Sequence, residues 1–193
     1  MALRYNWGMD SRLTDEQLML KYAAQDDRAF AVLYERHKGP VYRYILKSCT
    51  QPAIAQELFQ ELWLKIIRNK LRYDKQYAFT TWAYTMARNL IIDWLRKSGQ
   101  EPHNNDVVDS HEVAGMQLQE PDNVFEKKVM METVQKAVSQ LPYAQREVFL
   151  LRHEADMSFQ AIAAVSGCSL EAAKSRYRYA MEKIKTALER HHE

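Results

Sequence analysis

Apolar side chains recur at three- and four-residue spacing along almost the whole of this chain, and no other feature limits its fold as strongly. That spacing gathers apolar residues on one side of an α-helix, whereas a half-buried strand needs strict alternation. No segment of the sequence alternates convincingly, and Gly and Pro number only five each among 193 residues. The sequence therefore predicts an all-α fold.

The helical pattern lapses between residues 98 and 123, where two prolines, two glycines and a pair of asparagines stand without lasting periodicity. Segments of this kind act as flexible connections between folded parts. We therefore expect two helical domains, residues 1–97 and 124–193, joined by a flexible linker over residues 98–123.

The balance of charge changes at the same place. Residues 1–100 carry a net charge of +6, residues 101–126 carry −7 without any Lys or Arg, and residues 127–193 carry +3. Two basic blocks around an acidic connector suit two modules that each touch a polyanion. On charge alone, chance variation among solvated side chains is the alternative.

Five helices are expected in the first domain. Thr14 and Gln17 predict a capping box at the start of the first helix, and Gly39-Pro40 predicts the end of the second. The expected helices cover residues 14–25, 26–38, 41–48, 53–69 and 79–97, with a loop over residues 70–78.

Four helices are expected in the second domain, and the last two form a helix-turn-helix pattern. Ser158 and Ser169 suit the N-caps, Ala163 is small enough for a close crossing, and Gly167 suits a tight left-handed turn. The start of such a second helix faces base edges in the major groove of duplex DNA. A helical hairpin with a solvated charged face is the alternative. The expected helices cover residues 124–140, 142–154, 158–166 and 169–191, and the candidate DNA-reading residues are Glu171, Lys174, Ser175, Arg176 and Arg178.

Aromatic and basic residues alternate in the loop and helix between residues 70 and 97. Single-stranded nucleic acid needs this combination, because bases stack on aromatic rings while phosphates meet Lys and Arg. The alternative is that most of these aromatic residues belong to the core. The candidate residues are Tyr73, Tyr77, Phe79, Trp82, Arg88, Asn89, Asp93 and Arg96.

The expected helix over residues 53–69 has a second distinctive face. Opposite its apolar arc, two large apolar residues, Leu64 and Ile67, stand among the carboxylates and amides of Glu57, Gln60 and Glu61. Large apolar side chains in such a setting suit a docking patch for another protein. Scattered surface apolar residues are the alternative.

The sequence predicts no metal or cofactor site, because Cys49 and Cys168 lie far apart and form no Cys/His cluster. Both are expected to be reduced thiols in a cytoplasmic protein. No apolar run approaches the roughly 20 residues of a membrane-spanning helix, and residues 1–10 lack the apolar stretch of a secretory signal.

Four motifs, in order along the chain, together resemble the extracytoplasmic-function group (group 4) of the sigma-70 family, which are bacterial transcription initiation factors. Residues 57–61, ELFQE, resemble conserved region 2.2. Residues 79–96, FTTWAYTMARNLIIDWLR, are close to the signature FxxWLxxIARNxxxDxxR. Residues 141–149, LPYAQREVF, resemble the start of region 4, and residues 174–176, KSR, match its recognition helix.

The resemblance implies a non-enzymatic protein that binds core RNA polymerase, at the clamp helices of the largest subunit and at the flap, and directs it to promoters. It also implies an anti-sigma factor as a partner and a linker near the RNA exit path. By this resemblance, the residues that dock on the polymerase would be Glu57, Gln60, Glu61 and Leu64. The residues that recognise the −35 element would be Glu171, Lys174, Ser175, Arg176 and Arg178. The residues that capture the −10 element would be Tyr73, Tyr77, Phe79, Trp82, Arg88, Asn89, Asp93 and Arg96.

The sequence departs from the family pattern in two places. Residues 54–57, IAQE, keep one carboxylate where the family often has DAED, so polymerase affinity or its regulation is expected to differ. Residues 179–181, YAM, replace an RAR-like triplet after the KSR motif, and Ala172-Ala173 replaces Thr-Val. We therefore transfer no −35 consensus, and we expect Arg178 to take over a phosphate contact.

Two other functions are considered. A dimeric helix-turn-helix regulator would act without polymerase docking and would bind palindromic sites, but the sequence offers no long dimerisation heptad. A nucleic-acid enzyme would need clustered carboxylates or metal ligands. The nearest candidates are Asp26-Asp27 and His191-His192, which suit a helix cap and a chain end better.

Overall fold

The computed structural model describes residues 12–99 and 124–190, and for residues 124–127 the backbone alone. These described residues form α-helices, one 3₁₀-helix and no strand, which confirms the predicted all-α fold. The chain divides into two compact units, Met1–Trp94 and Leu95–Glu193. Except for residues 98 and 99, the expected linker lies outside the described residues. Among the helices described, none has the length and apolar character needed to cross a membrane.

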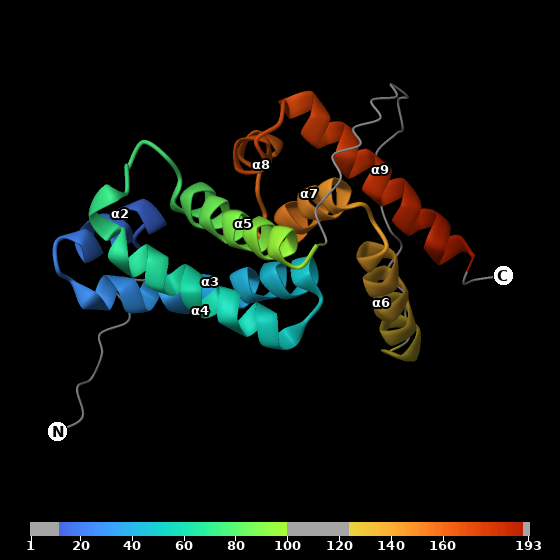
Figure 1. Ribbon diagram of the computed structural model, residues 1–193, viewed down its shortest axis with the longest axis horizontal. Coiled ribbons are helices and arrows are strands. Elements are labelled where there is room, and N and C mark those ends of the chain that lie inside the picture. The colour runs from blue at the N-terminus through green and yellow to red at the C-terminus, as the bar shows by residue number, and fades with distance from the viewer. Residues whose placement is uncertain (1–11, 100–123, 191–193) are drawn as a thin grey trace. The chain divides into compact units, whose positions relative to one another are not determined.

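The first unit is built around α3, which packs against both α2 and α4 (Figure 1). The predicted capping box at Thr14 is present: its hydroxyl accepts from the Gln17 N–H at 3.3 Å, and the Gln17 side chain accepts from the Thr14 N–H at 3.0 Å. The elements are α2 (Asp15–Ala23), α3 (Asp27–Cys49), α4 (Pro52–Arg68), the 3₁₀-helix η1 (Lys70–Arg72) and α5 (Phe79–Lys97). The predicted loop over residues 70–78 thus begins with a short helical turn.

The predicted helix end at Gly39-Pro40 is wrong, because α3 continues through this pair to Cys49. Proline removes one backbone hydrogen bond and its ring crowds the residue before it. That residue is Gly39, which has no Cβ to meet the ring. Apolar side chains on both sides of the pair, including Leu33 and Val41, are buried, and their packing favours one continuous helix over two.

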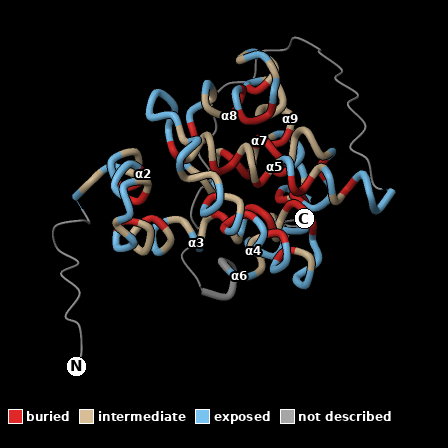
Figure 2. The backbone as a smooth tube through the Cα atoms, turned by 60° about the vertical axis from the view of Figure 1, so that its left-hand side comes forward, coloured by how far each residue is buried: buried red, intermediate tan, exposed pale blue. Residues whose placement is uncertain are grey.

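Buried apolar side chains from all four α-helices form the core of the first unit. Figure 2 shows the buried positions recurring along one side of each helix, with exposed positions opposite. The rings of Tyr44 on α3 and Tyr84 on α5 pack edge to face with centroids 5.2 Å apart. Full burial of one large apolar side chain contributes about 1.5–3 kcal/mol. The least exposed of these residues include Leu18, Met19, Leu33, Ile45, Leu62, Ile66 and Ile91.

The second unit is arranged around α9, which packs against each of the other three helices. Its core includes Val148 and Leu151 from α7, Ile162 from α8, and Ala180 and Ile184 from α9. Small residues such as Ala180 allow another helix to approach closely. The helices are α6 (Val124–Ser139), α7 (Tyr143–Glu154), α8 (Phe159–Ser166) and α9 (Leu170–Glu189), close to the predicted ranges.

Candidate nucleic-acid and protein interfaces

The turn between α8 and α9 has the geometry that the sequence predicted for a helix-turn-helix. Gly167 ends α8 in the left-handed conformation with φ of 63°, and the N–H of Cys168 donates to the carbonyl of Ala163 at 3.1 Å. The Ser169 hydroxyl then caps α9 by accepting from the Ala172 N–H at 3.1 Å. These bonds satisfy backbone groups that both helix ends would otherwise leave unpaired.

An aromatic cluster fixes the rotation of α9 about its own axis. The ring of Tyr177 stacks on Phe149 and His153 of α7 with centroid distances of 6.4 and 5.8 Å, and it meets the edge of Phe159 at 5.3 Å. Burial raises the pKa of Tyr177, and the nearby charge of Arg152 opposes that shift. The buried residues Ala173, Ala180 and Ile184 mark the side of α9 that faces the core, and part of the remaining surface of the helix is exposed to solvent.

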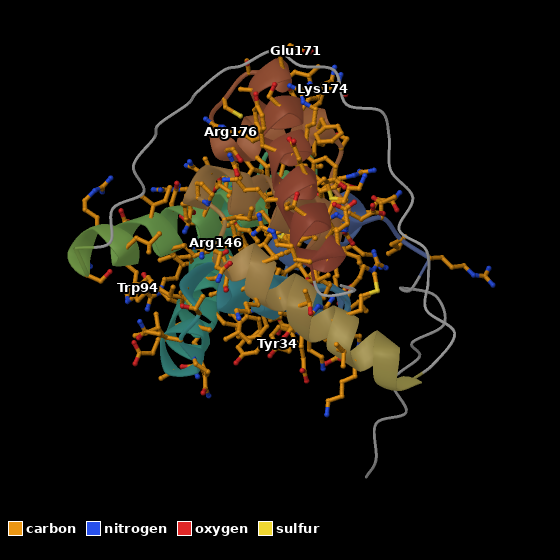
Figure 3. All side chains as sticks on the ribbon, turned by 90° about the vertical axis from the view of Figure 1, so that its right-hand side faces the viewer. Tyr34, Trp94, Arg146, Glu171, Lys174 and Arg176 are labelled. Atoms are coloured by element: carbon orange, nitrogen blue, oxygen red, sulfur yellow. The ribbon has the colours of Figure 1, made fainter. Side chains whose placement is uncertain are left out.

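That outward face begins with an ion pair at the start of α9. The ammonium of Lys174 lies 2.9 Å from Oε1 of Glu171, and both side chains are exposed. Figure 3 shows Glu171 and Lys174 at the N-terminal end of the helix, with Arg176 on the other side of the helix from Lys174. Arg178 lies with its guanidinium 5.5 Å from the centre of the Tyr179 ring. Ser175, Arg176 and Arg178 are half-buried.

The face of α5 opposite its core is polar and charged. Residues at three- and four-residue steps from Trp82, including Asn89, Asp93 and Arg96, lie along this face, and Arg88 stands at its edge. Asn89, Asp93 and Arg96 are exposed, while Trp82 and Arg88 are half-buried. The structure therefore brings five predicted residues onto one surface, spread over about 20 Å of helix axis.

Phe79 does not belong to this surface, although it was predicted to stack on bases. Only 1% of it is exposed. It precedes Ala83, Ala87 and Ile91 by four, eight and twelve residues, so it starts the buried stripe of α5 rather than the polar one. The ring of Phe79 packs against His37 of α3, with centroids 5.2 Å apart.

The loop before α5 arranges its two tyrosines differently. The ring of Tyr73 packs against Trp82 at 5.2 Å and Phe79 at 6.4 Å, and its hydroxyl donates to the carbonyl of Tyr77 at 2.7 Å. The side chain of Tyr77 is 62% exposed. Tyr77 is therefore available to meet a base, whereas Tyr73 is mostly engaged with the protein.

Carboxylates from α2 lie beside this loop, a feature that the sequence analysis missed. Glu16 accepts a hydrogen bond from the backbone N–H of Phe79 at 3.1 Å. Asp15 lies 2.6 Å from Nε2 of His37 and also pairs with Arg36. Because 63 residues separate Glu16 from Phe79, no local pattern in the sequence signals this contact.

The surroundings of Asp15 and of Tyr73 shift the pKa values of these two residues. Burial raises the pKa of Asp15, but hydrogen bonds and charge from His37 and Arg36 outweigh it, and the net pKa is lowered from 3.8. Burial, together with the charges of Glu16, Asp15 and Asp74, raises the pKa of Tyr73 to about 12. The Tyr73 hydroxyl consequently remains a hydrogen-bond donor near neutral pH.

The residues predicted to form a docking patch lie on the outer face of α4. Glu57, Gln60 and Glu61 are exposed, and Glu61 pairs with Lys65 at 3.4 Å. Leu64 is 49% exposed, which is a large fraction for a leucine in a helix that buries its opposite face. Ile67, the second apolar residue predicted on this face, is also exposed, and so is Leu71, which was not predicted.

Among the side chains of residues 12–99 and 128–190, no three from His, Cys, Asp or Glu gather as they would to hold a metal ion. Cys49 is buried and Cys168 is half-buried, and both are thiols outside any disulfide in the described residues.

Comparison with protein families gives two matches, one to each half of the chain. Residues 33–101 match the family model of Sigma-70 region 2, and residues 131–184 match that of Sigma-70 region 4. Together the two matches cover more than half of the sequence, in the order region 2, then region 4.

Curated relatives match the chain over most of its length. The RNA polymerase sigma-H factor of Pseudomonas aeruginosa is 28% identical over 91% of this chain and 94% of its own. The ECF RNA polymerase sigma factor RpoE of Cereibacter sphaeroides is 29% identical, over 83% of this chain and 87% of its own. The ECF RNA polymerase sigma-E factor of Escherichia coli is 26% identical, over 91% of this chain and 95% of its own.

Two solved structures share the fold. CnrH, in complex with the cytosolic domain of CnrY, superposes with a TM-score of 0.67 and 19% identity, covering 91% of this chain and 97% of that one. The sigma factor RpoE of Bartonella quintana, in complex with the anti-sigma factor NepR, gives a TM-score of 0.64 and 22% identity, covering 83% of this chain and 96% of that one.

Proposed function

Since this chain belongs to the extracytoplasmic-function group of the sigma-70 family, we propose that it binds core RNA polymerase and directs it to promoters through three separate surfaces. The observation that carries this proposal is the order of the two family matches, each on its own folded unit. A lone helix-turn-helix would support duplex binding and nothing more. A second, polymerase-docking unit makes the chain a promoter-specificity factor.

The first surface is the exposed start of α9, which reads duplex DNA at the −35 element. The capped turn at Gly167 supports this role, and so does the exposure of Glu171 and Lys174 in the first turns of α9. Lys and Arg can donate to guanine edges or phosphates, and Glu can accept from cytosine. Ser175, Arg176 and Arg178 complete the proposed contact set.

The second surface is the polar face of α5 with the loop before it, which captures the nontemplate strand at the −10 element. Tyr77 and Trp82 supply rings on which unpaired bases stack, and Arg88 and Arg96 supply cations for the phosphates. Asn89 and Asp93, both exposed on the same face, supply hydrogen-bonding groups. Phe79 is excluded from the contact set because it is buried. The ring of Tyr73 packs against Trp82 and Phe79, so Tyr73 supports the loop and does not itself meet a base.

The third surface is the outer face of α4, which docks on the clamp helices of the polymerase's largest subunit. Exposed carboxylates and amides around a solvent-facing Leu64 support this role, because apolar anchors within a polar rim are typical of protein interfaces. Docking on the polymerase holds both DNA-binding units near one promoter. Two individually weak DNA contacts then reinforce each other through effective concentration.

Regulation by an anti-sigma factor is part of the proposal, supported by the family membership and by the Bartonella quintana complex. Action together with the polymerase implies a cytoplasmic location. No catalytic role is proposed, because a sigma factor acts by binding.

The test is co-purification of the full chain with core polymerase, followed by runoff transcription from promoters that its own genome-wide binding map identifies. We expect a stable holoenzyme and transcripts that depend on the chain. The competing function, a dimeric regulator, predicts tight binding to palindromic duplexes without polymerase. That result, with no holoenzyme formed, would contradict the proposal.

A further inference from the structure

The first turn of α5 is held by a residue that lies far away in the sequence. The first N–H groups of an α-helix have no partner within the helix, and Ala78, the residue before α5, has no side-chain acceptor. Glu16 of α2 supplies one, since its Oε1 accepts from the Phe79 N–H at 3.1 Å. A carboxylate at this end of a helix is also favoured by the helix dipole.

Glu16 is itself held in place through its neighbour. Asp15 binds His37 of α3 at 2.6 Å, and the ring of His37 packs on the ring of Phe79. The contacts form a closed circuit: α3 holds α2 through Asp15, α2 holds the N–H of Phe79 through Glu16, and α3 holds the ring of Phe79 through His37. Few conformations of the first turn of α5 satisfy all of these contacts at once.

The loop before α5 is closed by its own residues. The Tyr73 hydroxyl donates to the Tyr77 carbonyl at 2.7 Å. Asp74 accepts from the Gln76 N–H through its side chain at 2.9 Å and from the Tyr77 N–H through its carbonyl at 3.1 Å. The loop is therefore ordered on both sides of Tyr77 while the Tyr77 ring stays exposed.

We propose that Glu16 and Tyr73 are positioning residues for the capture of single-stranded DNA. They hold residues 73–79 in the binding geometry before DNA arrives, and neither needs to touch it. An ordered loop loses less conformational freedom on binding than a disordered one, so the ordering raises affinity. This inference rests on the proposed −10 role of the loop and of α5.

The experiment uses full-length variants assembled with core polymerase. The probe is the single-stranded DNA oligonucleotide that wild-type holoenzyme enriches most from a random-sequence pool. Glu16→Ala removes the acceptor, Glu16→Gln keeps an oxygen that can accept, and Tyr73→Phe keeps the ring and removes only the hydroxyl. Glu35→Ala and Tyr42→Phe, both on α3, are the matched controls. Affinities for probe and for core polymerase are measured separately.

We expect Glu16→Ala and Tyr73→Phe to weaken probe binding about five- to tenfold, the range expected for one lost hydrogen bond. Core affinity should not change. The salt dependence of probe binding should also be unchanged, because no cation that meets a phosphate is removed. Glu16→Gln should stay within about twofold of wild type, and hydrogen exchange at the Phe79 amide should accelerate in Glu16→Ala alone.

Several outcomes would overturn the proposal. Wild-type probe binding by Glu16→Ala and Tyr73→Phe is one, and an equal loss of probe and core affinity, which marks a merely structural role, is another. If Glu16→Ala does not fold, Tyr73→Phe alone decides between these outcomes. A wild-type holoenzyme that enriches no sequence overturns the −10 assignment and this proposal together, so the two failures are distinguishable.

Discussion

Lys174 allows a residue-level test of duplex recognition, because α9 carries a second lysine in a matching setting. Lys174 pairs with Glu171 at 2.9 Å near the start of the helix, and Lys185 pairs with Glu189 at 3.5 Å roughly 16 Å further along the axis. We expect Lys174→Ala to weaken promoter binding and to reduce the salt slope by about one unit if one phosphate contact is lost. Holoenzyme titrations at several salt concentrations provide the measurement.

Lys185→Ala is the control for that titration and should leave the slope at its wild-type value. The same drop in both variants would mean that overall charge, rather than position on α9, governs binding. Wild-type affinity and slope in Lys174→Ala would remove Lys174 from the proposed −35 contact set.

The lowered pKa of Asp15 predicts how the free energy of unfolding depends on pH. Its pKa is lowered in the folded chain, so its ionised form is favoured by folding. The corresponding stabilisation is complete above the unfolded value of 3.8 and is lost as the pH falls through the lower folded value. We expect Asp15→Asn to be less stable than wild type near neutral pH and to lose less stability below about pH 4.

Urea unfolding at a series of pH values from about 3 to 7 gives the free energy of unfolding of wild type and of Asp15→Asn as a function of pH. Asp27→Asn, which changes an exposed carboxylate at the start of α3, is the comparison. Parallel pH curves for wild type and Asp15→Asn would contradict the contribution assigned to Asp15.

Single residues also show where sequence reasoning stops. The apolar stripe that Phe79 forms with Ala83, Ala87 and Ile91 is visible in the sequence. This stripe predicts that Phe79 is buried, whereas the aromatic motif predicted that it stacks on bases. The contact of Glu16 with Phe79 was not predictable, because it depends on how α2 folds back against the start of α5. Local patterns specify faces of helices, whereas contacts between helices come from packing.

At the level of elements, the capping motifs were predicted well and the continuity of α3 was not. Caps at Thr14, Ser158 and Ser169 depend on hydrogen bonds within three residues, so the sequence determines them locally. Whether a helix passes through Gly39-Pro40 depends on a balance between a local penalty and the burial of distant side chains. Only the assembled core decides that balance.

That balance predicts an interaction between two substitutions in α3. Pro40→Ala should stabilise the chain by about 1–3 kcal/mol, since proline is unfavourable inside a helix but also restricts the unfolded chain. Gly39→Ala should add about 1 kcal/mol when Pro40 is already replaced. Next to Pro40 the same change should gain little or destabilise, because the new Cβ meets the proline ring.

A double-mutant cycle measured by urea unfolding isolates this interaction. The Cβ that Gly39→Ala introduces would also lie 3.3 Å from the tip of the Arg43 side chain. That side chain is flexible, and it is present whether residue 40 is Pro or Ala, so it does not contribute to the interaction. Additive free energies of unfolding would contradict the account of α3 as a helix that tolerates proline because glycine precedes it.

For the whole molecule, the decisive question is whether the outer face of α4 governs holoenzyme assembly. Glu61→Lys reverses a charge in the proposed patch and should reduce affinity for core polymerase by more than about a hundredfold, because juxtaposed like charges at an interface cost several kcal/mol. Titration of labelled full-length chain with core polymerase measures the effect. The helix itself should lose only a few tenths of a kcal/mol from the new pair with Lys65.

Glu35→Lys is a closely matched control, because Glu35 is also exposed and pairs with a lysine, Lys38, at 2.7 Å on α3. It should bind core polymerase like wild type. Normal holoenzyme formation by Glu61→Lys, or equal loss in both variants, would remove α4 from the docking role.

The continuity of α3 has a consequence for how this chain tolerates insertions and deletions. His37 and Tyr44 lie on either side of the Gly39-Pro40 pair, and they contact Phe79 and Tyr84 of α5 respectively. In one unbroken helix, each residue added or removed between His37 and Tyr44 rotates one of these side chains by about 100° about the helix axis relative to the other. Length changes between positions 37 and 44 should therefore be far more damaging than changes in the loop before α5, and natural variants should keep this interval constant.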